Sequence, residues 1–116
     1  MFVRLSAALC GVLTMLVCVP AASAQSGIAS IYGYRHGITA NGEHVSTHRL
    51  TAAHRTLPFG SRVRVTNKRN GRSVVVRIND RGPYVRGRII DLTPAGAHAL
   101  GFSGITPVTV EVIGRG

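Results

Sequence analysis

The chain has 116 residues, and 14 Lys and Arg face only four Asp and Glu, which gives a formal net charge of +10. This length suffices for one small domain with a modest core, so we expect a single domain in this sequence. The two cysteines, Cys10 and Cys18, both lie near the start of the chain, so we expect neither a disulfide framework nor thiol chemistry in the folded domain. The positive balance is typical of proteins with a polyanionic partner.

The first 24 residues match a secretory signal peptide. Arg4 supplies the charged start, the apolar stretch 5–19 follows, and residues 22–24 (Ala-Ser-Ala) form a small-x-small cleavage site. The apolar stretch is shorter than the roughly 20 residues that span a bilayer, which disfavours a membrane anchor. Both cysteines follow a bulky residue, which disfavours a lipoprotein. We therefore predict a mature domain of residues 25–116, periplasmic or secreted and not inserted in the membrane.

Short strands separated by glycine-rich turns dominate the rest of the chain. The expected strands alternate polar and apolar residues or are continuously apolar, and in chain order they cover residues 27–32, 62–66, 73–78, 88–92 and 107–113. The Asn-Gly pair at 70–71 is a strong hairpin signal between two of them. A short helix is expected over residues 94–100, capped by Thr93 and ended by Gly101. Many short strands with so little helix indicate a small, closed or nearly closed β-barrel.

Asp80 is the most informative of the four carboxylates. It follows the apolar run 73–78 within Arg-Ile-Asn-Asp-Arg-Gly-Pro (77–83), where the Gly-Pro pair forces a turn. A scarce acid at the mouth of a strand is a candidate for acid–base chemistry or for an ion pair. The neighbouring Arg77 and Arg81 favour an ionised carboxylate, whereas a general acid must hold a proton. Burial or a second carboxylate, Asp91 or Glu43, would offset them, unless Arg81 points away and holds a loop.

Five blocks of the chain occur in a distinctive order: Thr-Ala-Asn-Gly-Glu (39–43), Leu-Thr-Ala-Ala-His-Arg-Thr-Leu-Pro-Phe-Gly (50–60), Val-Arg-Val-Thr-Asn (63–67), Asn-Asp-Arg-Gly-Pro (79–83) and Gly-Arg-Ile-Ile-Asp-Leu (87–92). In order and spacing they resemble the rare lipoprotein A family, whose barrel is similar to that of expansins. The resemblance implies a mainly β fold, a six-stranded double-psi β-barrel with one or two short helices.

The resemblance also implies an activity. The family's characterised enzymes are lytic transglycosylases that cleave MurNAc–GlcNAc bonds in peptidoglycan and prefer strands without stem peptides. In this chemistry the C6 hydroxyl of the sugar attacks its own C1 and gives a 1,6-anhydro end. One residue can then act first as acid and afterwards as base, so a chain with few carboxylates suffices.

Individual residues inherit expected roles from the same motifs. Asp80, Glu43 and His54 match the catalytic positions. Asp91 matches an acid that expansins keep, and it joins the expected substrate-binding residues, which also include Arg81, Tyr32, Thr39 and Asn79. We expect no metal and no cofactor, because the other histidines show no metal-ligand spacing with carboxylates or thiols.

Each of these residues also has a purely structural interpretation. Asp80 could cap a turn, and Glu43 could be an ordinary turn residue. His54 could be a core or loop imidazole, and Asp91 could be a buried ion-pair partner.

Three functions therefore stay open. The first is a secreted lytic transglycosylase that acts on peptidoglycan glycan strands. The second is a non-catalytic, expansin-like module that binds or loosens cell-wall polysaccharide. The third is a basic nucleic-acid-binding protein. In an exported protein, the anionic cell wall is a better partner for the positive charge than nucleic acid is, so we expect no nucleic-acid partner. We also expect a monomer.

Overall fold

The computed structural model describes residues 24–33 and 36–115. The signal peptide predicted for residues 1–24 therefore lies outside the described residues, except for its last residue. Within the described ranges, no helix is long and apolar enough to cross a bilayer. The elements in chain order are β1 (Gln25–Ile31), β2 (Thr51–Ala53), β3 (Ser61–Asn67), β4 (Ser73–Asp80), β5 (Arg88–Leu92), α1 (Pro94–Leu100) and β6 (Thr106–Arg115).

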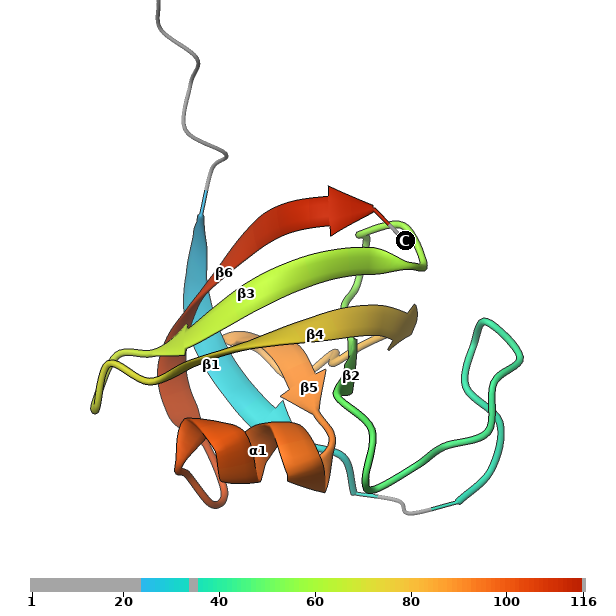
Figure 1. Ribbon diagram of the computed structural model, residues 1–116, viewed down its shortest axis with the longest axis horizontal. Helices are drawn as coiled ribbons and strands as arrows, with labels where there is room; N and C mark the ends of the chain where they lie inside the picture. Colours follow the sequence, from blue (N-terminus) through green and yellow to red (C-terminus); the bar gives the residue numbers. More distant parts are fainter. Residues whose placement is uncertain (1–23, 34–35, 116) are drawn as a thin grey trace, which may run out of the picture.

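The strands close into a barrel with the order β1-β5-β2-β4-β3-β6 (Figure 1). The pairs β1–β5 and β2–β4 are parallel, and the other neighbours are antiparallel. This mainly β architecture with a single short helix confirms the double-psi β-barrel expected from the sequence. Strand β2 was not expected, because its three residues are too few to show a period of two.

A single apolar core fills the barrel. In β3 the side chains of Val63 and Val65 are buried while Arg62 and Arg64 are exposed, so the strand alternates as its sequence indicates. Residues from the other strands and one helix residue complete the core, which consists of Ala29, Ala52, Val63, Val65, Val76, Ile78, Ile90, Leu92, Leu100, Val108 and Val110.

Helix α1 lies across one end of the barrel (Figure 1). Its bounds confirm the prediction, with the Thr93 side chain accepting a hydrogen bond from the Gly96 N–H and Gly101 ending the helix at φ 75°. The Thr93 hydroxyl also donates to the carbonyl of Arg49 at 2.6 Å. The cap therefore fastens the segment that leads into β2.

An irregularity in β4 turns Asp80 toward the outer surface of the sheet. Ala52 pairs with Ile78 and Ala53 pairs with Asp80, so Asn79 is the extra residue of a bulge. Ala52 and Ile78 both face the core. Since directly paired residues face the same side of a sheet, Asp80 lies on the opposite face from Ile78, although only one residue separates them.

Candidate active site

A row of paired residues crosses four strands on the outer face of the sheet. Ser30 pairs with Asp91, Asp91 with Ala53, and Ala53 with Asp80. Adjacent strands lie about 4.8 Å apart, so the Cα atoms of the two aspartates are separated by roughly 10 Å. Asp80 and Asp91 thus flank the small side chain of Ala53. Strand β2, antiparallel to β5 and parallel to β4, thus brings together two acids that lie 11 positions apart in the sequence.

Main-chain and side-chain donors hold the carboxylate of Asp80. The N–H groups of Ala40 and Arg81 both donate to Oδ1 at 2.9 Å, and the Tyr32 hydroxyl donates to Oδ2 at 3.1 Å. Asp80 is only 6% exposed. Main-chain groups thus fix Oδ1, whereas Oδ2 accepts from a hydroxyl, a group that can either donate or accept a hydrogen bond.

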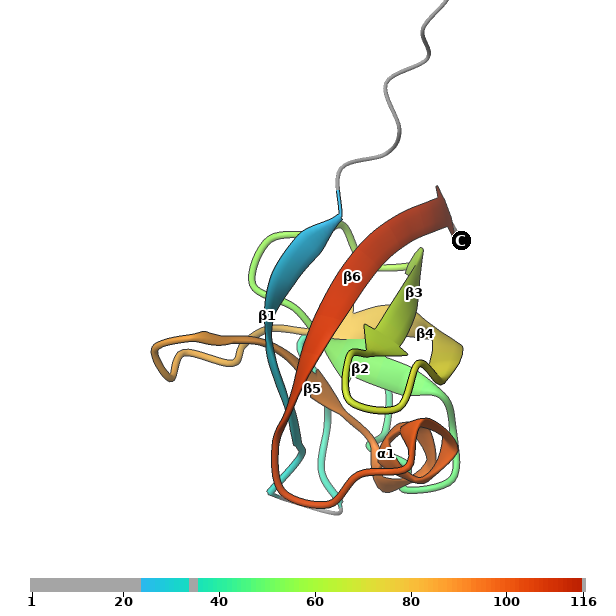
Figure 2. The same cartoon turned by 90° about the vertical axis from the view of Figure 1, so that its left-hand side faces the viewer.

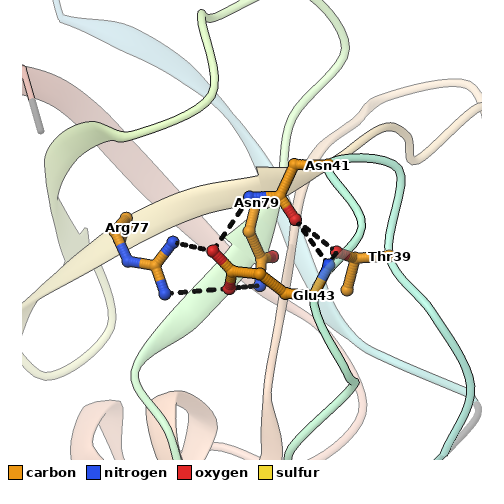
Figure 3. A network of polar contacts seen from close by, with 5 residues as sticks. All are labelled: Thr39, Asn41, Glu43, Arg77 and Asn79. Carbon is orange, nitrogen blue, oxygen red and sulfur yellow. Dashed lines mark hydrogen bonds and ion pairs between the residues drawn. The ribbon is translucent and has the colours of Figure 1, made fainter.

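Glu43 is the centre of a polar network (Figure 3). Its two oxygens accept from the Arg77 guanidinium at 2.6 and 2.9 Å, from Asn79 at 3.1 Å and from Asn41 at 2.9 Å. These hydrogen bonds, above all those from Arg77, lower the pKa of Glu43 from 4.5 to about 2. Glu43 is therefore ionised at neutral pH in this arrangement and has no proton to give.

The network fixes the loop that supplies one donor to Asp80. Thr39 donates its hydroxyl to Asn41 at 2.6 Å and accepts the Glu43 N–H at 3.2 Å. Ala40 lies between these residues in the chain. The Glu43–Arg77 pair thus holds the 39–43 loop, whose Ala40 N–H donates to Asp80.

Asn79 carries an unused acceptor beside this network. The residue is 2% exposed, and its amide nitrogen donates to Glu43. Because a carboxylate can only accept, this bond fixes which end of the amide is the oxygen. That oxygen, Oδ1, is buried without a hydrogen-bond partner. A buried acceptor left unpaired costs about 1–3 kcal/mol, so Asn79 is ready to accept from a donor that reaches it.

His54 is buried and neutral. Its Nδ1 accepts the N–H groups of Thr56 and Leu57, both at 3.2 Å, so the ring proton lies on Nε2, which donates to Gln25 at 2.9 Å. Burial, followed by the positive charges of Arg81 and Arg55, lowers the pKa of His54. A main-chain hydrogen bond of 3.1 Å joins the His54 N–H to the carbonyl of Asp80.

His54 also lines a cavity. The cavity has a volume of about 480 Å³ and is lined by Ala24, Gln25, His54, Thr56, Leu57, Val110 and Val112. Asp80 is not among these lining residues. His54 therefore lines this cavity and also contacts Asp80 through a main-chain hydrogen bond.

The two arginines beside Asp80 in the sequence have other partners. Arg77 binds Glu43. The Arg81 guanidinium donates to the carbonyls of His54 and Leu57 at 3.1 and 2.9 Å and lies 4.0 Å from the centre of the Phe59 ring. Arg81 thus fastens the 54–60 loop, in line with the loop-holding alternative derived from the sequence.

Asp91 is bound to a residue that sequence reasoning missed. The hydroxyl of Ser30 donates to Oδ1 of Asp91. Ser30 lies in an expected strand, but nothing local marks it as part of a site, because its partner is 61 positions away. Among the described residues, no group of three or more His, Cys, Asp and Glu side chains could hold a metal ion.

Comparisons with known proteins identify the family of this chain. Residues 24–112 match the family model described as "Lytic transglycolase". A protein of Nostoc sp. named "Probable endolytic peptidoglycan transglycosylase RlpA" is 61% identical over 95 residues, which cover 77% of this chain and 26% of that protein. The "Endolytic peptidoglycan transglycosylase RlpA" of Yersinia pestis is 54% identical over 91 residues, or 77% of this chain and 25% of that protein. The chain thus spans about a quarter of the length of these relatives.

Two solved structures share the fold. The Streptomyces papain inhibitor has a TM-score of 0.66 at 23% identity, covering 83% of this chain and 99% of the inhibitor. An expansin of Clavibacter michiganensis has a TM-score of 0.63 at 22% identity, covering 79% of this chain and 51% of the expansin. Such low identities show the fold alone. The family match over residues 24–112 and the close relatives show that the chain belongs to the lytic transglycolase family, in its RlpA-like branch with a double-psi β-barrel.

Proposed function

We propose that this domain is a peptidoglycan lytic transglycosylase that cleaves MurNAc–GlcNAc bonds and leaves 1,6-anhydroMurNAc ends. The observation that carries the proposal is the setting of Asp80, a buried carboxylate with one oxygen fixed by main-chain donors and the other facing a hydroxyl. The names of the relatives support the choice of peptidoglycan as substrate.

The proposed reaction needs one acid and no water. Protonated Asp80 donates from Oδ2 to the glycosidic oxygen as the bond from C1 to that oxygen breaks. The C6 hydroxyl oxygen of the same MurNAc attacks C1, and its proton passes to Oδ2 of Asp80. The acid is thereby restored, and the new ring closes between C1 and C6. Once Asp80 has given up its proton, the Tyr32 hydroxyl donates to Oδ2 and stabilises the ionised carboxylate.

The other site residues bind and position. In this proposal Asp91, which accepts a hydrogen bond from Ser30, also accepts hydroxyl groups of the neighbouring sugar. The unpaired Oδ1 of Asn79 accepts one more. We assign Glu43 a positioning role, because its ionised carboxylate holds the loop that contacts Asp80.

The remaining expected site residues hold the backbone. Thr39 belongs to the loop that Glu43 fixes. His54, as a neutral imidazole, shapes the turn to which Arg81 is fastened.

We also propose that the domain works as a monomer in the periplasm or outside the cell, after cleavage behind residue 24. Its partner is the glycan strand of the cell wall, and no nucleic acid is involved. The location follows from the substrate, since peptidoglycan lies outside the cytoplasmic membrane. The intact mass of exported protein tests the cleavage, and a species that retains Met1 would contradict it.

The experiment that tests the function is a digestion of peptide-stripped glycan strands followed by mass spectrometry of the new ends. A lytic transglycosylase gives ends lighter by one water than the reducing ends left by hydrolysis. Reducing ends would identify a hydrolase instead. Strands that sediment with the protein without gaining new ends would identify the expansin-like binding module.

A further inference from the structure

The loop between β4 and β5 exposes a large apolar side chain. Tyr84 is 76% exposed and its neighbour Val85 is 53% exposed, and Tyr84 is the most exposed large apolar residue of the described chain. Figure 2 shows this loop projecting from the barrel wall. Burying a side chain of this size stabilises a protein by about 1.5–3 kcal/mol. The exposed aromatic ring of Tyr84 therefore offers an apolar surface that a ligand can cover.

The loop is held rigidly although it is exposed. The guanidinium of Arg55 donates to three of its carbonyls: Pro83 at 2.6 Å, Val85 at 3.3 Å and Arg88 at 2.9 Å. One side chain from the β2–β3 segment thus fixes the loop at its beginning, middle and end. A ligand that meets this loop does not have to order it first, and such pre-organisation improves affinity.

The ring of Tyr84 lies close to the turn that begins at Asp80. A Cβ atom added at Gly82 would be 3.6 Å from Cε2 of Tyr84, so the ring edge rests against the Gly82 backbone. Tyr84 lies four positions after Asp80, and a chain of that length spans at most about 14 Å. The exposed ring is thus within the length of a few linked sugars from the proposed acid.

We propose that Tyr84 is a sugar-stacking subsite that holds one pyranose ring of the glycan strand beside the bond cut at Asp80. The proposal rests on the proposed function and names a contact for the same substrate. The C–H groups on the face of a pyranose ring are apolar and slightly positive, and the face of an aromatic ring is negative. The apolar patch is only two side chains wide, which is far too small for a stable protein–protein interface but matches a single sugar ring.

Four variants test the subsite by calorimetric titration with peptide-free glycan strands and by the rate of anhydro-end release. Tyr84→Ala removes the ring, and Tyr84→Phe keeps the face while removing the hydroxyl. Arg55→Ala keeps the ring but frees the loop. Ile105→Ala is the control, because Ile105 is 48% exposed in the loop that follows α1.

An aromatic contact of ordinary strength changes an affinity by about 2- to 10-fold. We expect Tyr84→Ala and Arg55→Ala to raise Kd and KM by this factor, with kcat within about twofold of wild type. Tyr84→Phe and Ile105→Ala should behave like wild type. Circular dichroism confirms that each variant is folded.

The outcomes separate the subsite from the chemistry. If wild type cleaves strands and Tyr84→Ala has an unchanged Kd and KM, the subsite is wrong and the function stands. If wild type releases no anhydro ends but Tyr84→Ala still weakens binding, the chemistry is wrong and the subsite stands. A loss in Tyr84→Phe equal to that in Tyr84→Ala would overturn stacking in favour of the hydroxyl. A wild type that sediments as a dimer and becomes monomeric on Tyr84→Ala would assign the patch to a second copy, and would also overturn the proposal.

Discussion

Replacing Glu43 by Gln keeps the shape of the side chain and removes its charge. The pKa of Glu43 falls from 4.5 to about 2 in the folded domain, a difference that corresponds to at most about 3.4 kcal/mol of stability at neutral pH. The Glu43 and Arg77 side chains are 33% and 34% exposed, so solvent screening reduces this to about 1–2 kcal/mol. For a domain of this size we expect a melting temperature about 5–10 °C lower at pH 7.

The pH dependence of this loss identifies its cause. Because the pKa is lowered on folding, the stabilisation is complete above pH 4.5 and disappears as the pH falls toward about 2. The melting temperatures of wild type and Glu43→Gln, measured as a function of pH, should therefore become equal as the pH falls toward about 2. Release of anhydro ends should also fall in the variant, since the loop that carries the Ala40 N–H loses its anchor.

Glu111→Gln is the matched control for this experiment. Glu111 pairs with Arg64 through one contact of 3.1 Å between side chains that are 39% and 46% exposed. Such a surface pair contributes about 0–1 kcal/mol. Thermal unfolding followed by circular dichroism between pH 2 and 7 provides the measurement. A Glu43→Gln variant that loses no more stability than Glu111→Gln, or whose deficit is the same at every pH, would refute the reasoning.

Two further predictions concern stability. The pKa of His54 is lowered on folding, so the free energy of unfolding of wild type should decrease as the pH falls below about 6.5. Urea denaturation at a series of pH values should show a smaller decrease for His54→Gln. The same decrease in the variant would assign the titration to another group. A Cβ at Gly27 would lie 2.6 Å from the Ile89 side chain, whereas one at Gly114 meets nothing within 4 Å. Gly27→Ala should therefore lower the free energy of unfolding in urea by about 1–3 kcal/mol, and Gly114→Ala should lower it far less. Equal losses in the two variants would contradict the close contact between Gly27 and Ile89.

Local sequence signals were enough for most of the elements. The alternation around Val63 and Val65 predicted β3, and the Thr93 and Gly101 caps predicted the bounds of α1. Strand β2 carries no such signal, because three consecutive buried residues show no period. The many short strands indicated a closed or nearly closed barrel, but its strand order depends on pairings far apart in the chain, and only the resemblance to a known family predicted the six-stranded double-psi form.

The sequence named candidate site residues, but it did not show the contacts between them. The motif around Asp80 marked that acid, yet the bulge at Asn79 that turns it outward depends on pairing with β2. The Glu43–Arg77 pair joins residues 34 positions apart and changes what Glu43 can do, from a candidate acid to an ionised anchor. Such roles depend on tertiary neighbours, which no local pattern records.

The most direct test of the proposed chemistry is the rate at which Asp80→Asn releases anhydro ends from peptide-free glycan strands. The amide oxygen of the variant can still accept the N–H groups of Ala40 and Arg81, so we expect the fold to survive. Loss of the proton donor should lower the rate by at least about 10²-fold, since general acid–base catalysis contributes about 10²–10⁴-fold. A folded Asp80→Asn variant that releases anhydro ends at the wild-type rate would show that Asp80 is not the acid, and Asp91 would become the candidate.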